Sequence, residues 1–185
     1  MSLVIDTGYQ QFRSADVGLS YFSDASKDGV IPAQSYSLRT RDGRIVYDAI
    51  RTDGVVFDIY DGGLKTGWCR STGEIGLPPD WRFNASLGKF EPKPEGEGWK
   101  RGFSIPVAIT KTNFALWEQA QTASFQAVCD VAVKISRMER PDGKLPVVCH
   151  TGFREIRLAK GPLQVPVLEV VKWTQRPTCL PPLGY

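Results

Sequence analysis

One histidine, His150, limits the catalytic chemistry open to this chain of 185 residues. Imidazole is the side chain whose ordinary pKa lies near neutrality, and most proton-transfer and transition-metal sites use it. His150 follows Cys149 in a short apolar run that predicts a strand, and neighbouring strand residues point to opposite faces. The two side chains therefore do not act on one substrate atom, and we expect a structural role for His150.

The four cysteines carry no motif of a metal or redox site. They lie at positions 69, 129, 149 and 179 and form no Cys-x-x-Cys pair, so the spacing of a zinc ribbon or a redox centre is absent. The N-terminal residues reach the acidic Asp6 too early for a secretion signal. We therefore expect reduced, mostly buried thiols in a cytoplasmic protein.

Clustered aspartates leave a carboxylate-metal enzyme as a third interpretation. Asp48, Asp58 and Asp61 fall on or beside neighbouring predicted strands, and magnesium sites need no histidine. Aspartates beside Asp-Gly turns are, however, usually solvated hairpin residues. The chain also has no phosphate-binding glycine loop and no nucleophile elbow. We expect a protein without enzymatic activity or cofactor.

Basic and aromatic residues interleave in the segment that follows Cys69. Single-stranded nucleic acid is bound by cations that follow the phosphates and by flat side chains on which exposed bases stack. We expect the phosphates to be held by Arg70, Arg82, Lys100, Arg101, Lys172 and Arg176, with bases stacked on some of Trp68, Trp81, Trp99 and Phe103. The alternative is that these tryptophans attach a long loop to the body of the protein, and both can hold for different residues.

Charge is divided unevenly along the chain. Residues 1–80 carry 8 basic and 11 acidic side chains, a net −3, whereas residues 81–185 carry 15 and 9, a net +6. The basic part also contains the irregular segment, so an acidic partner is expected to bind there. No apolar run approaches the roughly 20 residues of a membrane helix, so we expect no membrane partner.

The elements that must position these residues are mainly strands. Asp-Gly turns separate β-branched and aromatic runs in the first third, which predicts an antiparallel meander. The strands of this meander are predicted over 36–40, 44–50 and 55–60, and later strands over 102–109, 145–158 and 165–173. Pro106 would place its strand at an edge or a bulge. One helix is predicted from a cap at Thr112 or Asn113 through Arg140, because Phe114, Trp117 and later apolar residues recur at helical spacing.

This order of elements predicts a single domain, 1–185, that is mainly β with one helix. It carries an irregular loop at about 71–101 and an extended proline-rich tail at about 176–185. A meander, one helix and two further strands are typical of an OB-fold-like antiparallel barrel. The alternatives are a β-sandwich and an open α+β sheet.

The C-terminal two-thirds resembles a group of bacteriophage-encoded proteins. The resemblance lies in Trp99-Lys-Arg-Gly-Phe-Ser-Ile, the alanine-rich helix, Gly143-Lys-Leu-Pro-Val-Val, and the run from Val165 through Pro177. Those proteins are suspected OB-fold single-stranded DNA-binding proteins, so the resemblance implies a role in phage replication or recombination. This chain ends in Pro181-Pro-Leu-Gly-Tyr185 and lacks the acidic tip of the bacterial proteins of that function.

These observations together predict a non-enzymatic single-stranded DNA-binding protein. The alternative is a phage virion component or an inhibitor that binds a host protein, with tryptophan and arginine as anchors of the interface. A homodimer is compatible with both predictions, because a strand edge containing Pro106 and a modest net charge of +3 do not prevent association.

Overall fold

The computed structural model of the chain describes residues 17–20, 35–39, 45–50, 53–73, 79–112 and 114–182. The predicted turns at Asp28-Gly29 and Asp42-Gly43 lie outside these ranges. Within the three N-terminal strands, only the backbone and its pairing are described.

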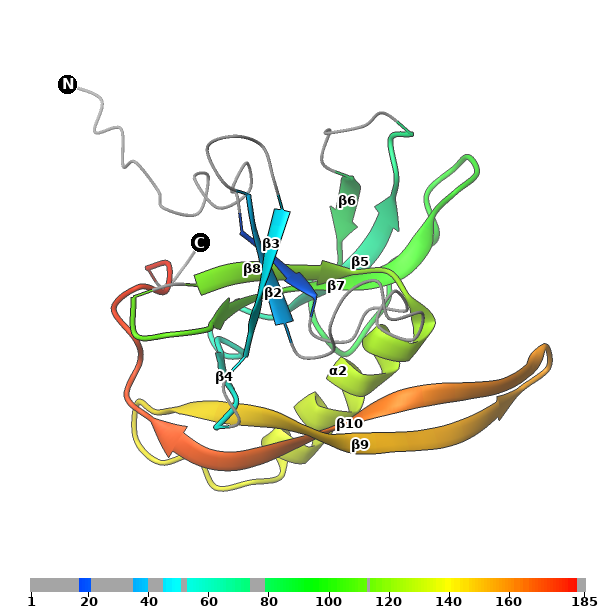
Figure 1. Cartoon of the computed structure of the whole chain (residues 1–185). Coiled ribbons are helices and arrows are strands. Elements are labelled where there is room, and N and C mark those ends of the chain that lie inside the picture. Colours follow the sequence, from blue (N-terminus) through cyan, green and yellow to red (C-terminus); the bar gives the residue numbers. More distant parts are fainter. Residues whose placement is uncertain are drawn as a thin grey trace.

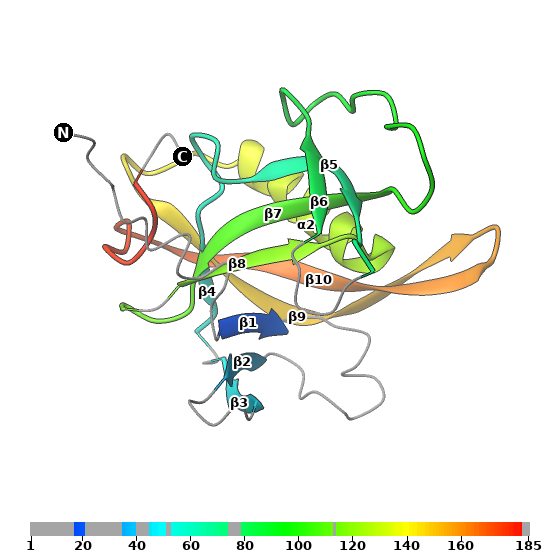
Figure 2. The ribbon, with the colours of Figure 1, turned by 90° about the horizontal axis from the view of Figure 1, so that it is seen from above.

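Within the described residues, the chain forms two antiparallel sheets and one long helix (Figure 1). The smaller sheet contains β1 (Val17–Ser20), β2 (Ser35–Arg39) and β3 (Ile45–Ala49) in that order. The larger sheet contains β4 (Val55–Phe57), β5 (Lys65–Arg70), β6 (Asp80–Phe83), β7 (Lys100–Ala108), β8 (Phe114–Gln119), β9 (Leu145–Leu158) and β10 (Gly161–Thr174). The helix is α2 (Thr122–Ser136). Strand β1 lies beside β8, which brings the smaller sheet next to the larger one (Figure 2).

Strand β7 organises the larger sheet because it has three partners. The order runs β10-β9-β4-β7-β5-β6, and β8 also pairs with β7. Strands β4 and β5 pair with opposite ends of β7, and β8 overlaps both of them in register. Because a strand has only two edges, β4 and β5 share one edge of β7 and β8 occupies the other.

The sequence predicted that Pro106 lies at the edge of a sheet or at a bulge. In the structure Pro106 lies inside β7, which has partner strands on both edges. The Asp58 backbone N–H donates to the Pro106 carbonyl at 3.0 Å, so this side of Pro106 faces the gap between β4 and β5. The N and carbonyl groups of one strand residue point to the same edge. The proline nitrogen therefore faces the gap between β4 and β5, where no neighbouring strand needs a hydrogen-bond donor.

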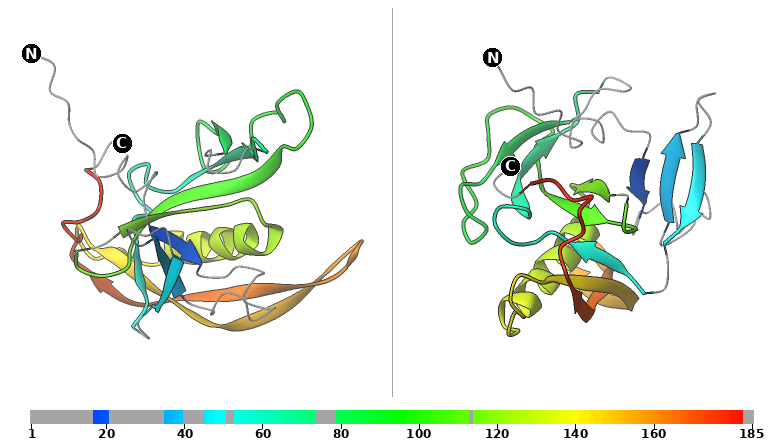
Figure 3. Two further views of the ribbon diagram at one scale, coloured as in Figure 1. Left: turned by 45° about the horizontal axis from the view of Figure 1, so that its top comes forward. Right: turned by 90° about the vertical axis from the view of Figure 1, so that its left-hand side faces the viewer.

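The main core lies between the sheet and α2. Its largest fully buried side chains include Phe57, Phe103 and Trp117, with Val128 and Val131 from the helix. Phe103 and Trp117 meet edge to face with ring centroids 4.8 Å apart. Helix α2 packs against β10 and β7 and fills the space between the central strands and the β9–β10 hairpin (Figure 3). In the described ranges, no helix is long and apolar enough to cross a membrane.

A mainly β chain with one helix is confirmed, but the described larger sheet is not closed into a barrel. The predicted meander also divides: β2 and β3 form a hairpin, whereas β4 leaves them and pairs with β7 and β9. Gly54, with φ +86°, permits this change of sheet, because a Cβ there would lie 2.5 Å from the Val148 carbonyl oxygen.

The helix begins later than the periodicity predicts. Residues 114–119 form strand β8, and α2 starts at Thr122 with Gln121 as its N-cap. Phe114 and Trp117 are three residues apart, which places them on one face of a helix but on opposite faces of a strand. Both are buried because the sheet has a core on each face: Trp117 belongs to the main cluster and Phe114 to a second one with Ala108 and Leu180.

The predicted loop and tail are more ordered than expected. Strand β6 occupies residues 80–83 within the predicted irregular segment 71–101. In the predicted tail, a turn joins the Leu180 N–H to the Pro177 carbonyl at 3.2 Å, and Leu180 is buried in the second cluster. Residues 183–185 lie outside the described ranges.

Candidate nucleic-acid interface

Strands β5, β6 and the first half of β7 gather most of the predicted binding residues at one end of the sheet. In this register Trp68 lies between Arg82 and Arg101 on its neighbouring strands, and Cys69 lies between Trp81 and Lys100. Residues directly opposite across strands share a face, and residues alternate along each strand. Trp68, Arg82 and Arg101 are therefore on one face of the sheet, and Trp81 and Lys100 on the other.

The first face is covered by residues 84–99, and we call it the loop face. The Trp68 indole Nε1 donates to the Glu91 carbonyl at 2.9 Å, and its ring meets Phe90 edge to face at 5.8 Å. The Arg101 guanidinium lies 4.7 Å from the Phe90 ring centroid and 5.6 Å from that of Trp68. The ring of Phe90 also contacts Phe125 of α2. Trp68 therefore attaches the loop to the sheet.

Trp99 also has a structural role. It is 7% exposed, and its Nε1 donates to the Glu95 carbonyl at 3.1 Å. The Arg70 guanidinium lies 4.6 Å from the Trp99 ring centroid and donates to Asp80 at 2.7 Å. Arg70 and Trp99 thus hold the end of the loop against β5 and β6, as the structural interpretation of these tryptophans predicts.

Phe103 does not stack on a base, contrary to one of the options from the sequence. Its exposure is 0%, and its ring packs against Trp117 inside the main core. The sequence places Phe103 two residues after Arg101 in an alternating strand, and that position faces α2 and not solvent. The prediction that Phe103 contacts nucleic acid is therefore wrong.

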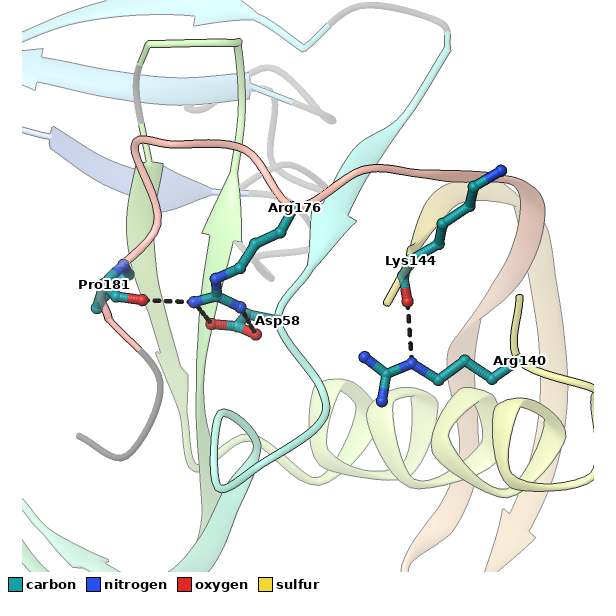
Figure 4. A network of polar contacts seen from close by, with 5 residues as sticks. All are labelled: Asp58, Arg140, Lys144, Arg176 and Pro181. Carbon is teal, nitrogen blue, oxygen red and sulfur yellow. Dashed lines mark hydrogen bonds and ion pairs between the residues drawn. The ribbon is translucent and has the colours of Figure 1, made fainter. Parts of the chain in front are cut away.

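Arg176 and Lys172 do not join the other basic residues. Both lie at or beyond the end of β10, and β10 and β6 are the two terminal strands in the sheet order. The Arg176 guanidinium makes a bidentate ion pair with Asp58 at 2.6 and 2.7 Å and also donates to the Pro181 carbonyl (Figure 4). These donors are used inside the fold, so the structure gives Arg176 a structural role and does not support a phosphate contact there. Lys172 is exposed and lies 3.7 Å from Asp53.

The other face of β5, β6 and β7 carries an aromatic pair, and we call it the glycine face after Gly67 and Gly102. The Trp81 and Phe83 rings stack with centroids 5.0 Å apart and an interplanar angle of 11°. A Cβ at Gly102 would lie 2.9 Å from the Trp81 ring. Because glycine has no Cβ, the indole can pack directly against the backbone of β7. Phe83 is 36% exposed, and the Lys65 ammonium lies 5.7 Å from its ring centroid.

Phe83 and Lys65 lie on this surface but were not among the binding residues predicted from the sequence. Trp81 and Phe83 are two residues apart, which is the strand period, and Arg82 between them points to the loop face. This alternation would have identified the pair if residues 80–83 had been interpreted as a strand. The glycine face carries Lys65 and Lys100 on these strands, and Glu118 of the adjoining strand β8 lies on the same face, opposite Ser104.

The described residues offer no metal centre. No group of three or more histidine, cysteine, aspartate or glutamate side chains converges within the described ranges. Asp58 is engaged by Arg176, and the side chain of Asp48 lies outside the described residues. The thiols are free, and burial raises the pKa of Cys69 to about 11, with Glu118 and Asp80 adding to the shift. Cys69 is thus protonated near neutral pH and is a weak nucleophile.

His150 gives the fold a pH dependence. Burial lowers its pKa below the ordinary value, while a backbone hydrogen bond with Gly152 acts in the opposite direction. The unfolded chain therefore takes up the proton more readily, and the free energy of unfolding should fall as the pH drops from about 6.5 to the lower pKa of the folded state, and then level off. We expect urea titrations between pH 7.5 and 5.5 to show this loss. The difference between wild type and His150→Gln should grow smaller towards low pH; a constant difference would contradict this assignment.

The fold and the site together define a mainly β protein with one helix and an aromatic, basic surface at the β6 end of its larger sheet. Comparisons of the chain with models of protein families, with curated proteins and with solved structures found no match.

Proposed function

We propose that the protein binds single-stranded nucleic acid on its glycine face, where bases stack on the Trp81–Phe83 pair. The observation that carries this proposal is the stacked pair itself, since Phe83 is 36% exposed on an edge strand. Exposed aromatic rings on a sheet are the usual platform for unpaired bases, because every base has a flat face. The Lys65 ammonium lies over the Phe83 ring, and a base that continues the stack would displace it towards the phosphate chain.

The charges around the pair support a bound phosphate chain. Lys65 lies over Phe83 and Lys100 lies across β5 from Trp81, whereas Arg82 is exposed on the edge strand and points to the loop face. The acidic residues Glu91, Glu95 and Glu97 lie on the loop that covers the opposite face. On the glycine face, Glu118 of β8 offsets part of the charge of Lys65 and Lys100, and the remaining positive charge favours a polyanion. The role in phage replication or recombination that the sequence resemblance implies belongs to this same proposal.

We expect Phe83→Ala and Trp81→Ala each to weaken binding of a 20-nucleotide oligo-dT by about tenfold or more, because a base–aromatic stack contributes about 1–3 kcal/mol. Fluorescence anisotropy at low salt measures the affinity. Phe153→Ala is the matched control, because Phe153 is also exposed, at 54%, but lies on the β9–β10 hairpin. Equal affinities of the Phe83 and Phe153 variants, or no binding by the wild type, would overturn the proposal.

Salt gives a second test of the same site. The slope of log affinity against log salt should be about −0.7 for each phosphate that the protein neutralises on a single strand. Lys65→Ala with Lys100→Ala should reduce the magnitude of the slope by about 1.4 if each lysine contacts one phosphate. Lys172→Ala, which removes an exposed lysine at the other end of the sheet, should leave the slope unchanged.

Recognition of a partner protein is the second candidate function, as for a virion component or an inhibitor of a host protein. A groove of about 530 Å³ lies beside the aromatic pair, and Ile59, Leu64, Phe83 and Leu87 contribute to its lining. Leu87 is 51% exposed there. Nuclease-treated extract should yield one stoichiometric partner with the wild type and none with Leu87→Asp if this function holds.

A further inference from the structure

The β9–β10 hairpin extends away from the rest of the sheet as a free ribbon (Figures 1 and 2). Strand β9 pairs with β4 only at Val147 and Val148, so beyond these residues its sole described partner strand is β10. The hairpin is held near its middle by an ion pair between Arg154 and Asp130 of α2. The residues past Ile156 lie beyond this attachment.

The outermost part, residues 157–162, is basic, and we call it the hairpin tip. It contains Arg157 and Lys160, both exposed, and no acidic residue. Within the described part of the chain, neither of these two side chains has an ion pair. Leu158 is 46% exposed beside them. The tip therefore offers two free cations around one apolar side chain, a combination that favours an anionic partner with an apolar interior.

The free edge of β10 is protected against another strand. Pro162 and Pro166 are paired with Arg157 and Phe153, and they are four residues apart, so their nitrogens point to the same edge. Proline has no N–H, and within a ribbon its nitrogen faces away from the partner strand. The outer edge thus lacks two donors that an added strand would need. A partner of the tip is bound through side chains and not by sheet extension.

We infer that the hairpin tip binds double-stranded nucleic acid next to the single strand held on the glycine face. A two-stranded ribbon fits a groove of duplex DNA, cations contact the phosphates on either side, and an apolar side chain can wedge against the base pairs. The hairpin lies across α2 from β7, and the glycine face is on the side of β7 away from α2. The tip and the loop between β6 and β7 extend to the same side of the molecule (Figures 1 and 2), so a nucleic acid that passes around this side could reach both the tip and the β6 edge. This inference rests on the proposed function and adds a junction between single and double strand as its substrate.

The test compares two labelled DNAs by anisotropy at equal salt: oligo-dT of 20 nucleotides, and the same oligo-dT attached to a 20-base-pair duplex. The wild type should bind the junction at least tenfold more tightly. The variant R157A/L158A/K160A should lose this preference and keep its affinity for oligo-dT. Its salt slope on the junction should fall in magnitude by about 1.8, because two phosphate contacts on duplex DNA are lost. These substitutions are at exposed positions, and a urea titration checks that the fold is unchanged.

The matched control is K111A/K144A, which removes one lysine from the connection between β7 and β8 and one from the residue before β9, both outside the hairpin tip, and should keep the preference. No junction preference in the wild type, or an unchanged preference in the tip variant, would overturn the inference. A tip that instead mediates self-association would show as a wild-type dimer in sedimentation that the tip variant abolishes. Duplex binding that depends on the tip, without any binding of oligo-dT, would overturn the proposed function and leave the role of the tip standing.

Discussion

Phe103→Ala should lower the free energy of unfolding by about 3–5 kcal/mol, the usual loss when a buried phenylalanine is truncated in a core. Phe103 is completely buried, and Trp117, which it contacts at 4.8 Å, also meets Phe57 at 6.0 Å. Removing the ring leaves a cavity between the central strands and α2 that the surrounding side chains fill only in part. Urea denaturation followed by tryptophan fluorescence and circular dichroism measures the loss.

Phe83→Ala provides the comparison for this variant, because it removes the same ring from an exposed position. We expect it to cost about 1 kcal/mol or less, since surface substitutions have small effects. The two phenylalanines should therefore separate stability from binding. Truncating Phe103 should affect unfolding, and truncating Phe83 should affect oligo-dT affinity. A Phe103→Ala protein of normal stability that fails to bind oligo-dT would contradict the structural assignment.

Arg176→Ala should also be strongly destabilising, by about 3–5 kcal/mol, because it leaves an uncompensated charge in the protein interior. The Asp58 side chain is only 5% exposed, and both of its oxygens accept hydrogen bonds from Arg176 at 2.6 and 2.7 Å. The same arginine donates to the Pro181 carbonyl, so its loss also releases the segment that contains Leu180. The midpoint of urea unfolding measures the effect.

Two further variants show whether buried charge is the cause. Lys172→Ala breaks an ion pair with Asp53 in which both side chains are more than half exposed, and should change stability by about 1 kcal/mol at most. Asp58→Leu combined with Arg176→Met removes both charges and should recover much of the stability lost in Arg176→Ala. A single Arg176→Ala substitution no more costly than Lys172→Ala would show that Asp58 is not held by this pair.

Local patterns predicted most of the strands but not the way they assemble. Alternation and β-branched residues identified β2, β3, β4, β7, β9 and β10, because each run is long enough to show its own period. The partners of β4 could not be predicted, since its pairs at Val147 and Ala108 are many residues away in the chain. The start of the helix was misplaced because a strand with a core on both faces can imitate helical spacing, as Phe114 and Trp117 do.

Only part of the candidate surface was predicted from the sequence, and the reason is related. The interleaved tryptophans and arginines do lie together on β5, β6 and β7, but the sequence does not show which face each one occupies. Trp68 and Trp99 attach the loop, whereas Trp81 takes its place over Gly102 only because β6 pairs with β5. Arg176 contacts a carboxylate 118 positions earlier in the chain, and no local pattern reports such a partner.

The pairing of β4 with residues from distant parts of the chain has a kinetic consequence. Its three residues join β7 to β9, and the next residue, Asp58, is neutralised by Arg176. These contacts close large loops, and topologies dominated by such contacts fold slowly, because the entropy of loop closure is lost before the contacts form. We therefore expect refolding in milliseconds to seconds, with the hairpins β2–β3 and β9–β10 formed early. The centre of the sheet would remain incomplete until the segment that contains Arg176 reaches Asp58.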